Sequence, residues 1–175
     1  MPRRSPIPRR VLALEPLTAA AFAPFGEVIE AAAHAPRFAI NQGTAERFDD
    51  LARIDTARGG GRTRVSIFRA LPRTLPLRLA LVERHLLGSQ AFMPLAPQRF
   101  LVVVAAPGPV PQVQGLRCFV AAHGQGINLA PGVWHHSLLS LDEAGDFLVI
   151  DRGGSGIALD CEERALDSLE VWIEG

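Results

Sequence analysis

The most constraining feature of this sequence is the regular alternation of short apolar segments with turns such as Pro107-Gly108-Pro109 and Pro131-Gly132. Apolar runs such as Leu101–Ala106 are well under the roughly 20 residues that a membrane-spanning helix needs, so we expect no transmembrane segment and no membrane partner. About ten short strands at near-even spacing are typical of antiparallel sandwiches and barrels, and not of alternating strand–helix units. The sequence therefore predicts an all-β fold.

The candidate strands are apolar or β-branched segments that lie between turn signals. They are Val11–Leu14, Phe38–Asn41, Thr63–Arg69, Leu77–His85, Gln90–Leu95, Phe100–Ala105, Leu116–Ala122, Gly126–Leu129, Val133–Leu139, Phe147–Asp151 and Leu169–Ile173. Helical pattern is scarce. We expect one short helix over Thr18–Ala23, with Thr18 as its N-cap and Pro24 as its stop. Ala45–Arg53 and Glu162–Leu166 are weaker helix candidates.

Length and charge favour one domain that does not bind nucleic acid. A chain of 175 residues suits a single hydrophobic core, which we expect over residues 11–175. Four of the 18 arginines lie in the first ten residues, which predicts a flexible basic leader over residues 1–10. The rest of the chain then holds 14 arginines against 18 acidic residues, so it offers no basic face for phosphates.

The absence of lysine and the spacing of the cysteines exclude further classes of protein. Without lysine the chain cannot form a Schiff base, and it cannot carry the glycine-rich phosphate loop that ends in lysine. Cys118 and Cys161 do not form a Cys-x-x-Cys pair, and the start of the chain lacks the apolar core of a secretory signal. We therefore expect a reducing, cytoplasmic setting.

Polar residues at strand ends mark the candidate site. Side chains alternate between the two faces of a strand, so Glu83 and His85 continue an apolar inner face toward the rim of a sheet. Gln90 opens the next strand after a short turn. A second histidine pair, His135-His136, follows the turn at Pro131-Gly132, and at most one of that pair can face the same cavity.

This arrangement resembles the two motifs of the cupin superfamily, with Glu83 and His85 at its paired histidines, Gln90 at its carboxylate and His135 three residues after a glycine. The resemblance implies a jelly-roll β-barrel whose two hairpins direct Glu83, His85, Gln90 and His135 at one point. Such donors suit a divalent ion such as Ni, Mn, Fe or Zn. Replacement of one histidine by Glu83 and of the acid by Gln90 disfavours tight iron binding, which leaves Ni, Mn or Zn, held loosely, or no metal.

A more specific resemblance covers Leu12 to Gly154. Five segments occur in the order typical of the ureidoglycolate lyase family, a cupin-fold family of allantoin and purine breakdown. They are Phe38–Gly43, Glu83–His85, Leu87–Pro94, Val133–His136 and Asp146–Gly154. The resemblance implies a homodimer that cleaves a small-molecule substrate, ureidoglycolate, to glyoxylate and urea.

The resemblance also implies roles for these side chains. The reaction needs a base near the substrate hydroxyl and an acid near the departing nitrogen. Glu83, His85 and His135 are the catalytic candidates. If a metal is bound, they and Gln90 are its ligands; otherwise Glu83 or one histidine is the base and the other histidine is the acid.

Arg69 and Asn41 are the candidates for binding the substrate. Val65, Ile67 and Arg69 share one strand face, so if the first two point inward, Arg69 ends that face and its guanidinium could bind a carboxylate bidentately. A salt bridge at the rim is the alternative. Asn41 is either a turn former or a ligand donor.

Other residues have structural interpretations. We expect His136 to be structural, His34 and His123 to be exposed, and Trp134 to lie in the core or an interface. Cys118 is expected to be a free buried thiol.

Three other functions stay open. The chain could be another metal-dependent cupin enzyme, an oxygenase or isomerase of small hydroxy or keto acids. It could be a non-catalytic small-molecule-binding cupin, or a β-sandwich whose histidines and glutamate are ordinary rim residues.

Overall fold

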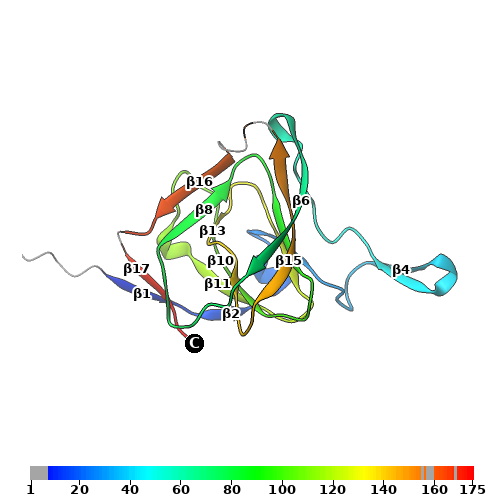
Figure 1. The fold of residues 1–175 in the computed structure, drawn as a ribbon, viewed down its shortest axis with the longest axis horizontal. Coiled ribbons are helices and arrows are strands. Elements are labelled where there is room, and N and C mark those ends of the chain that lie inside the picture. The colour runs from blue at the N-terminus through cyan, green and yellow to red at the C-terminus, as the bar shows by residue number, and fades with distance from the viewer. Residues whose placement is uncertain (1–7, 155, 157–159, 168) are drawn as a thin grey trace, which may run out of the picture.

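The computed structural model describes residues 8–154, 156, 160–167 and 169–175, and strands dominate them (Figure 1). The largest sheet has the order β16-β8-β13-β10-β11-β2, with β14 also paired to β10. Its strands are β2 (Leu14–Pro16), β8 (Leu81–His85), β10 (Phe100–Ala105), β11 (Arg117–Ala121), β13 (Trp134–His135), β14 (Leu139–Ser140) and β16 (Cys161–Ala165).

Three smaller sheets complete the fold. The first has the order β3-β12-β9-β15-β6, formed by β3 (Gly26–Ile29), β6 (Gly61–Ala70), β9 (Gln90–Pro94), β12 (Gly126–Leu129) and β15 (Gly145–Gly154). The second has the order β1-β17-β7, formed by β1 (Arg9–Leu12), β7 (Leu77–Leu79) and β17 (Glu170–Ile173). The third is a hairpin of β4 (Arg37–Ile40) and β5 (Ala45–Phe48).

Strand β10 is apolar at every position, and its place in the core explains why. All six residues of β10 are buried, because both faces of the largest sheet are covered. One face packs on the β3-β12-β9-β15-β6 sheet, where Phe100 meets Phe147 edge-on at 5.3 Å between ring centroids. The other face, with Val103 and Trp134, packs on Val171 and Ile173 of the β1-β17-β7 sheet. The all-β prediction is therefore confirmed, and no strand pairing among the described residues closes the two larger sheets into a hydrogen-bonded barrel.

One of the three helix predictions is confirmed. Helix α1 (Ala19–Phe22) begins after Thr18, whose hydroxyl accepts a hydrogen bond from the backbone N–H of Ala21 at 3.2 Å. The predicted helix over Ala45–Arg53 is wrong, because β5 pairs with β4 across a turn in which Asn41 and Gln42 have positive φ. The predicted helix over Glu162–Leu166 is also wrong: this segment lies beside β8 as strand β16, since an unpaired sheet edge was available to it.

Two further boundaries differ from the sequence-based expectation. Arg9 and Arg10 were assigned to the flexible leader, but they lie in β1 and pair in parallel with Glu170 and Val171. Residues 1–7 lie outside the described residues. The predicted strand over Val133–Leu139 is interrupted, because only Trp134–His135 and Leu139–Ser140 pair with β10.

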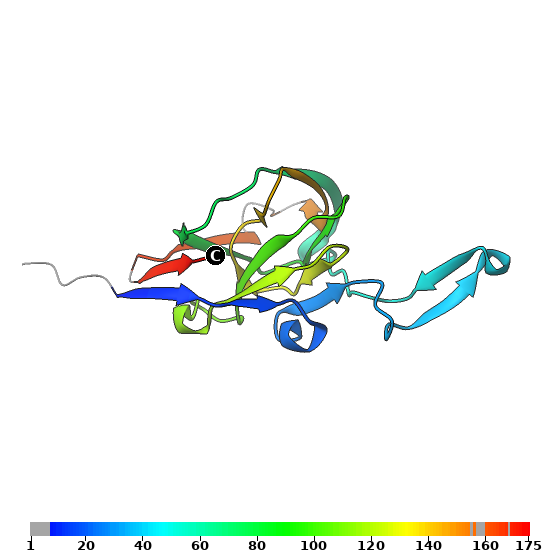
Figure 2. The ribbon, with the colours of Figure 1, turned by 90° about the horizontal axis from the view of Figure 1, so that it is seen from below.

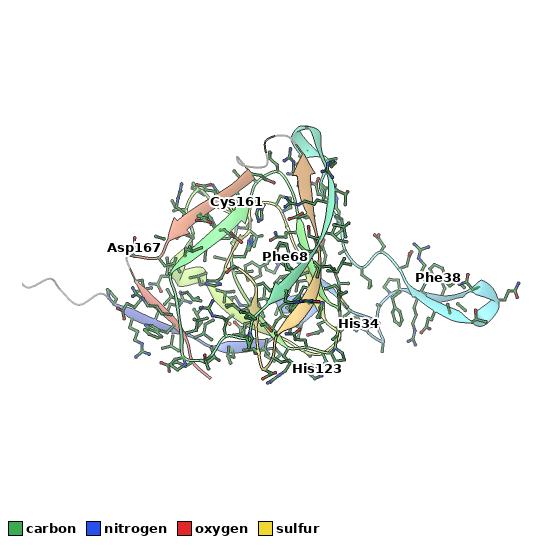
Figure 3. The ribbon with its side chains drawn as sticks, viewed as in Figure 1. His34, Phe38, Phe68, His123, Cys161 and Asp167 are labelled. Atoms are coloured by element: carbon green, nitrogen blue, oxygen red, sulfur yellow. The ribbon has the colours of Figure 1, made fainter. Side chains whose placement is uncertain are left out.

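The β4–β5 hairpin projects away from the two larger sheets (Figure 1 and Figure 2). Among the described residues its strands pair only with each other. Phe38, on β4, is 47% exposed (Figure 3). An isolated two-stranded hairpin is marginally stable in water, so this one is expected to need a packing partner.

None of the helices formed by the described residues has the length and apolar character needed to span a membrane.

Candidate functional site

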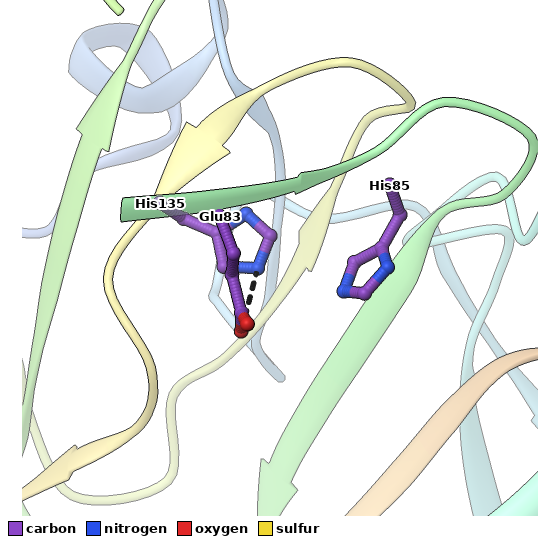
Figure 4. Close-up of side chains that lie close together, drawn as sticks. All are labelled: Glu83, His85 and His135. Carbon is purple, nitrogen blue, oxygen red and sulfur yellow. Dashed lines mark ion pairs between the residues drawn. The ribbon is translucent and has the colours of Figure 1, made fainter. Parts of the chain in front are cut away.

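Glu83, His85 and His135 come together at one point between the two larger sheets (Figure 4). His135 lies directly opposite Glu83 on the neighbouring antiparallel strand, and its Nε2 is 3.6 Å from Glu83 Oε1. The rings of His85 and His135 are 5.4 Å apart between centroids. Each of the three residues places one donor atom within 4.8 Å of the others. The structure thus brings together the three residues predicted to be catalytic.

Local sequence explains this convergence. Glu83 and His85 are two residues apart on β8, so their side chains share a face. The turn before β13 has Gly132 at φ 84°, and its N–H donates to the carbonyl of His85 at 2.7 Å, which ties the turn to the site. His135 Nδ1 lies 3.0 Å from the carbonyl of Val133. If Nδ1 donates that bond, the lone pair of Nε2 faces Glu83 and His85.

Three buried polar atoms of the predicted ligand set have no hydrogen-bond partner among the described residues: His85 Nε2, Gln90 Oε1 and His135 Nε2. Gln90 opens β9 in the facing sheet and is 6% exposed. Buried polar atoms are normally hydrogen-bonded, so these unpaired atoms, two of which belong to the cluster with Glu83, indicate a site for a ligand or an ion. Glu83, His85 and His135 are therefore three candidate ligands for a divalent cation, and Gln90 lines the same cavity as Glu83.

The electrostatics of the site favour an ionised Glu83 and a neutral His85. The imidazole of His135 beside Glu83 lowers the pKa of this carboxyl group, against the opposing effect of burial. Burial is the largest cause of a lowered pKa at His85, and the nearby His135 lowers it further. At neutral pH Glu83 is therefore an anion, and His85 is an uncharged base.

A cavity of about 410 Å³ adjoins Glu83 and Gln90, and we call it the main cavity. Its other lining residues are Phe68, Arg69, Ala70, Phe92, Ser137 and Leu138. Most of this lining is apolar, with a few polar groups near Glu83, which is typical of a pocket for a small organic molecule.

The structure places the two predicted substrate-binding residues differently from the expectation. Val65 and Ile67 are 64% and 53% exposed, so the premise that they point inward is wrong. Arg69 shares their outward face, lies at the rim of the main cavity, and donates two hydrogen bonds to Asp146 at 2.8 and 2.9 Å. The inward residues of β6 are the alternate ones, because their cross-strand partners Phe147 and Val149 are buried. Asn41 lies in the turn of the β4–β5 hairpin, with φ 51°, as a turn former.

Three residues that were not site candidates in the sequence, Arg64, Asp160 and Cys161, lie with His85 around one further cavity. Arg64 and Arg69 lie on opposite faces of β6, because their positions are an odd number of residues apart. This alternation was the only indication in the sequence that Arg64 points the other way. Cys161 lies opposite His85 on β16, with its Sγ 3.8 Å from Glu83 Oε2. Together with Glu83 and Glu163 it forms a second, more exposed group of candidate ligands.

The remaining histidines and Trp134 have the structural positions expected of them. His34 and His123 are exposed (Figure 3). His136 is half-buried, and its backbone N–H donates to the carbonyl of Val103 at 3.0 Å. Trp134 is fully buried, donates through Nε1 to the carbonyl of Gly108 at 3.1 Å, and carries the guanidinium of Arg84 over its ring. Cys118 is a free buried thiol whose pKa burial raises to about 12.

Comparison with known proteins identifies relatives over nearly the whole chain. The sequence profile of the family described as "Ureidoglycolate lyase" matches residues 9–174. A ureidoglycolate lyase of Burkholderia mallei is 51% identical over 164 residues, which cover 94% of each chain. A ureidoglycolate lyase of Pseudomonas syringae pv. syringae is 47% identical over 155 residues, which cover 89% of each chain. A solved dTDP sugar isomerase of Desulfovibrio desulfuricans aligns with a TM-score of 0.47 and 17% identity, over 83% of this chain and 88% of that one.

Proposed function

The chain belongs to the ureidoglycolate lyase family, and from this premise we propose that it cleaves ureidoglycolate to glyoxylate and urea, a reaction of allantoin and purine breakdown. The structural observation that supports this function best is the close approach of Glu83 and His135 beside the unpaired Nε2 of His85, with the unpaired Oε1 of Gln90 on the facing sheet. These groups supply a base, an acid and a polar anchor within one small region. They are the elements that this elimination needs.

The chemistry of the substrate defines what the site must do. The reacting carbon of ureidoglycolate carries a hydroxyl, a carboxylate and the ureido nitrogen. Cleavage of the carbon–nitrogen bond turns the hydroxyl into the aldehyde of glyoxylate, so the hydroxyl loses a proton and the departing nitrogen gains one. No water is consumed, and the proton count of the protein is unchanged at the end of the cycle.

We assign these proton transfers to the two histidines. His85 is a neutral base because its pKa is lowered, and its buried Nε2 has no other hydrogen-bond partner among the described residues, so it takes the hydroxyl proton. His135 Nε2 lies 3.6 Å from Glu83 Oε1, on the other side of the cluster from His85, and we assign to His135 the proton transfer to the departing nitrogen. Gln90 orients the substrate by hydrogen bonds from the facing sheet.

The same four side chains fit a divalent cation. Glu83, His85, Gln90 and His135 would hold a Ni, Mn or Zn ion, and the contact of His135 Nδ1 with the Val133 carbonyl is the kind that orients a ligating histidine. When bound there, such an ion would lower the pKa of the substrate hydroxyl and template the substrate. In that arrangement Gln90 and the histidines contribute by fixing the site.

A coupled assay tests the proposed function directly. Wild-type protein is incubated with ureidoglycolate, with and without a chelator, and glyoxylate and urea are quantified separately. Equal amounts of both products, with loss of activity in His85→Ala, would support the proposal. Release of ammonia in place of urea would indicate a hydrolytic reaction and contradict it.

We also propose that the protein is a cytoplasmic homodimer. Both cysteines are free thiols, which suits a reducing compartment. The unpartnered β4–β5 hairpin exposes Phe38, and the outer face of β6 exposes Val65 and Ile67. Two exposed apolar surfaces on one chain can cover each other in a symmetric pair, and the two-fold dimer is the commonest symmetric assembly.

A further inference from the structure

A second cavity, of about 120 Å³, lies next to His85, and we call it the arginine cavity. Its lining residues are Arg64, His85, Ser89, Asp151, Arg152, Asp160 and Cys161. All seven of these residues are polar or ionisable, whereas four of the eight residues that line the main cavity are apolar. The volume of the arginine cavity is less than a third of that of the main cavity, which suits a small polar group such as a carboxylate.

Arg64 is one of two arginines that line this cavity, and its guanidinium is held in a fixed orientation. Its Nε and Nη2 donate to the two oxygens of Asp151 at 2.8 and 2.6 Å. Asp151 lies directly opposite on β15, and its side chain is only 8% exposed. The third guanidinium nitrogen, Nη1, has no hydrogen bond to any of the described residues. A fork held on one edge by a buried carboxylate is preorganised to bind a second carboxylate on its free edge.

The other charged residues build the walls around Arg64. Arg152 donates through Nε to the carbonyl of Arg58 at 2.8 Å and through Nη2 to that of Gly59 at 3.0 Å. A Cβ atom at Gly61 would lie 2.4 Å from Arg152 Nε, so this side chain is closely packed. Asp160 accepts a hydrogen bond from the backbone N–H of Leu87 at 2.6 Å. The cavity is therefore built by buried groups that are already engaged.

We propose that the arginine cavity is the carboxylate subsite of this enzyme and that Arg64 is the residue that binds the substrate carboxylate, a proposal that rests on the proposed function. His85 forms part of this cavity, whereas Glu83 and Gln90 line the main cavity. A carboxylate on Arg64 places the adjacent reacting carbon beside His85. The neutral ureido group then extends into the main cavity, toward Gln90 and Ser137.

Direct binding of a small carboxylate tests this subsite without relying on turnover. Glycolate carries the hydroxyl and carboxylate of the substrate without its ureido group, and glycolamide is its neutral counterpart. Calorimetric titration should show that wild-type protein binds glycolate at least tenfold more tightly than glycolamide. Arg64→Ala should weaken glycolate binding at least tenfold and leave glycolamide binding unchanged. Arg64→Lys, which keeps the charge without the fork, should weaken glycolate binding as well.

Two further variants separate this proposal from its rivals. Arg99→Ala removes another arginine that binds an aspartate bidentately, Asp142, on the exposed surface, so it should leave glycolate binding unchanged. Arg69→Ala tests the residue that the sequence alone favoured, and it should also bind glycolate as the wild type does. Circular dichroism of each variant checks the fold, and Asp151→Asn, which removes the anchor of Arg64, provides an independent variant that should also bind glycolate more weakly.

The outcomes are decisive for each proposal separately. Equal glycolate affinity in wild type and Arg64→Ala, loss of binding in Arg69→Ala alone, or no glycolate binding by the wild type would overturn the carboxylate subsite. Glycolate binding that depends on Arg64 in a protein that does not cleave ureidoglycolate would retain the subsite and overturn the proposed function. Cleavage of ureidoglycolate with the same KM in wild type and Arg64→Ala would retain the proposed function and overturn the carboxylate subsite.

Discussion

Glu83 and His135 face each other across a single antiparallel strand pair, and Glu83 Oε1 lies 3.6 Å from His135 Nε2. Directly opposed residues in such a pair are held at a short, fixed distance by the backbone. The geometry of the pair therefore depends on the register of β8 and β13, and not on flexible loops. His85 lies two residues further along β8, so the same strand fixes its position relative to Glu83.

Loss of either partner should abolish most of the activity. Glu83→Gln keeps the shape of the side chain but removes the charge, and His135→Ala removes the proton donor. Each should lower kcat/KM for ureidoglycolate by roughly 10²–10⁴-fold, the usual contribution of a general acid or base. Urea and glyoxylate release are the measurements. His123→Ala, at an exposed histidine, is the control; wild-type rates in Glu83→Gln and His135→Ala would refute the assignment.

A divalent cation should stabilise the wild-type protein against heat. A ligand that binds only the folded state at 100 times its Kd adds about 2.7 kcal/mol of stability. The midpoint temperature of thermal unfolding should therefore rise when Ni, Mn or Zn is added to the wild type, and it should not rise for His85→Ala or Gln90→Leu. Cys161→Ser should respond as the wild type does; loss of the shift in this variant alone would move the ion to the group of Glu83, Cys161 and Glu163.

Acid should weaken the contact between β2 and β11. The hydrogen bonds from Arg117 lower the pKa of Glu15 below its usual value in the folded protein. The stability from this ionisation is therefore present above the pKa of the unfolded chain, near 4.5, and is lost as the pH falls through the lower folded pKa. Urea unfolding at pH 3–6 should show a shallower pH dependence for Glu15→Gln.

Glu143→Gln, at an exposed carboxylate with no ion pair among the described residues, should retain the pH dependence of the wild type. If Glu15→Gln and wild type show the same pH dependence, the Glu15–Arg117 pair does not contribute to stability.

Phe147 should be the costliest core position to truncate in the interface between the two larger sheets. Its side chain is fully buried and packs edge-on against Phe100, with an interplanar angle of 81°. Phe147→Ala should lower the free energy of unfolding by about 3–5 kcal/mol, from lost burial and the cavity left behind. Val110→Ala, at a 51% exposed position outside the proposed dimer interface, should change it by less than about 0.5 kcal/mol. Urea unfolding measures both, and a loss under 1 kcal/mol in Phe147→Ala would contradict this account of the core.

The exposed hairpin should mediate self-association. Sedimentation equilibrium should show a dimer for the wild type, and Phe38→Asp or Val65→Asp should shift it toward monomer, because each places a charge in an apolar interface. Val110→Asp changes an exposed apolar residue elsewhere and should remain dimeric. A wild-type monomer, or dimers in all variants, would exclude this interface.

The candidate site was accessible from the sequence because it depends on local rules. The two-residue spacing of Glu83 and His85 determines that they share a face in any strand. The Pro131-Gly132 turn determines that His135 lies at the start of a strand. The resemblance to a known family then brought Gln90 into the same set. The resemblance also supplied the convergence of the two segments, which depends on β8 and β13 being neighbours.

The position of Arg69 could not be determined by such local rules. Alternation assigns Arg64 and Arg69 to opposite faces of β6, but it does not say which face meets the core. Val65 and Ile67 suggested the wrong one, because apolar residues can also lie on an exposed sheet face that awaits a partner. Only the pairing of β6 with β15 places Arg64 opposite the buried Asp151 and Arg69 opposite Asp146.

The sequence by itself determined the β class, the single capped helix and the shared face of Glu83 and His85, since each follows from contacts between residues close along the chain or from period-two alternation; the resemblance to a known family added His135. Tertiary structure alone decided that residues 161–165 form a strand beside β8, that the β4–β5 hairpin stands apart, and that Arg64 faces the arginine cavity. Those outcomes depend on pairing between segments far apart in sequence, and such pairing energies have no local signature.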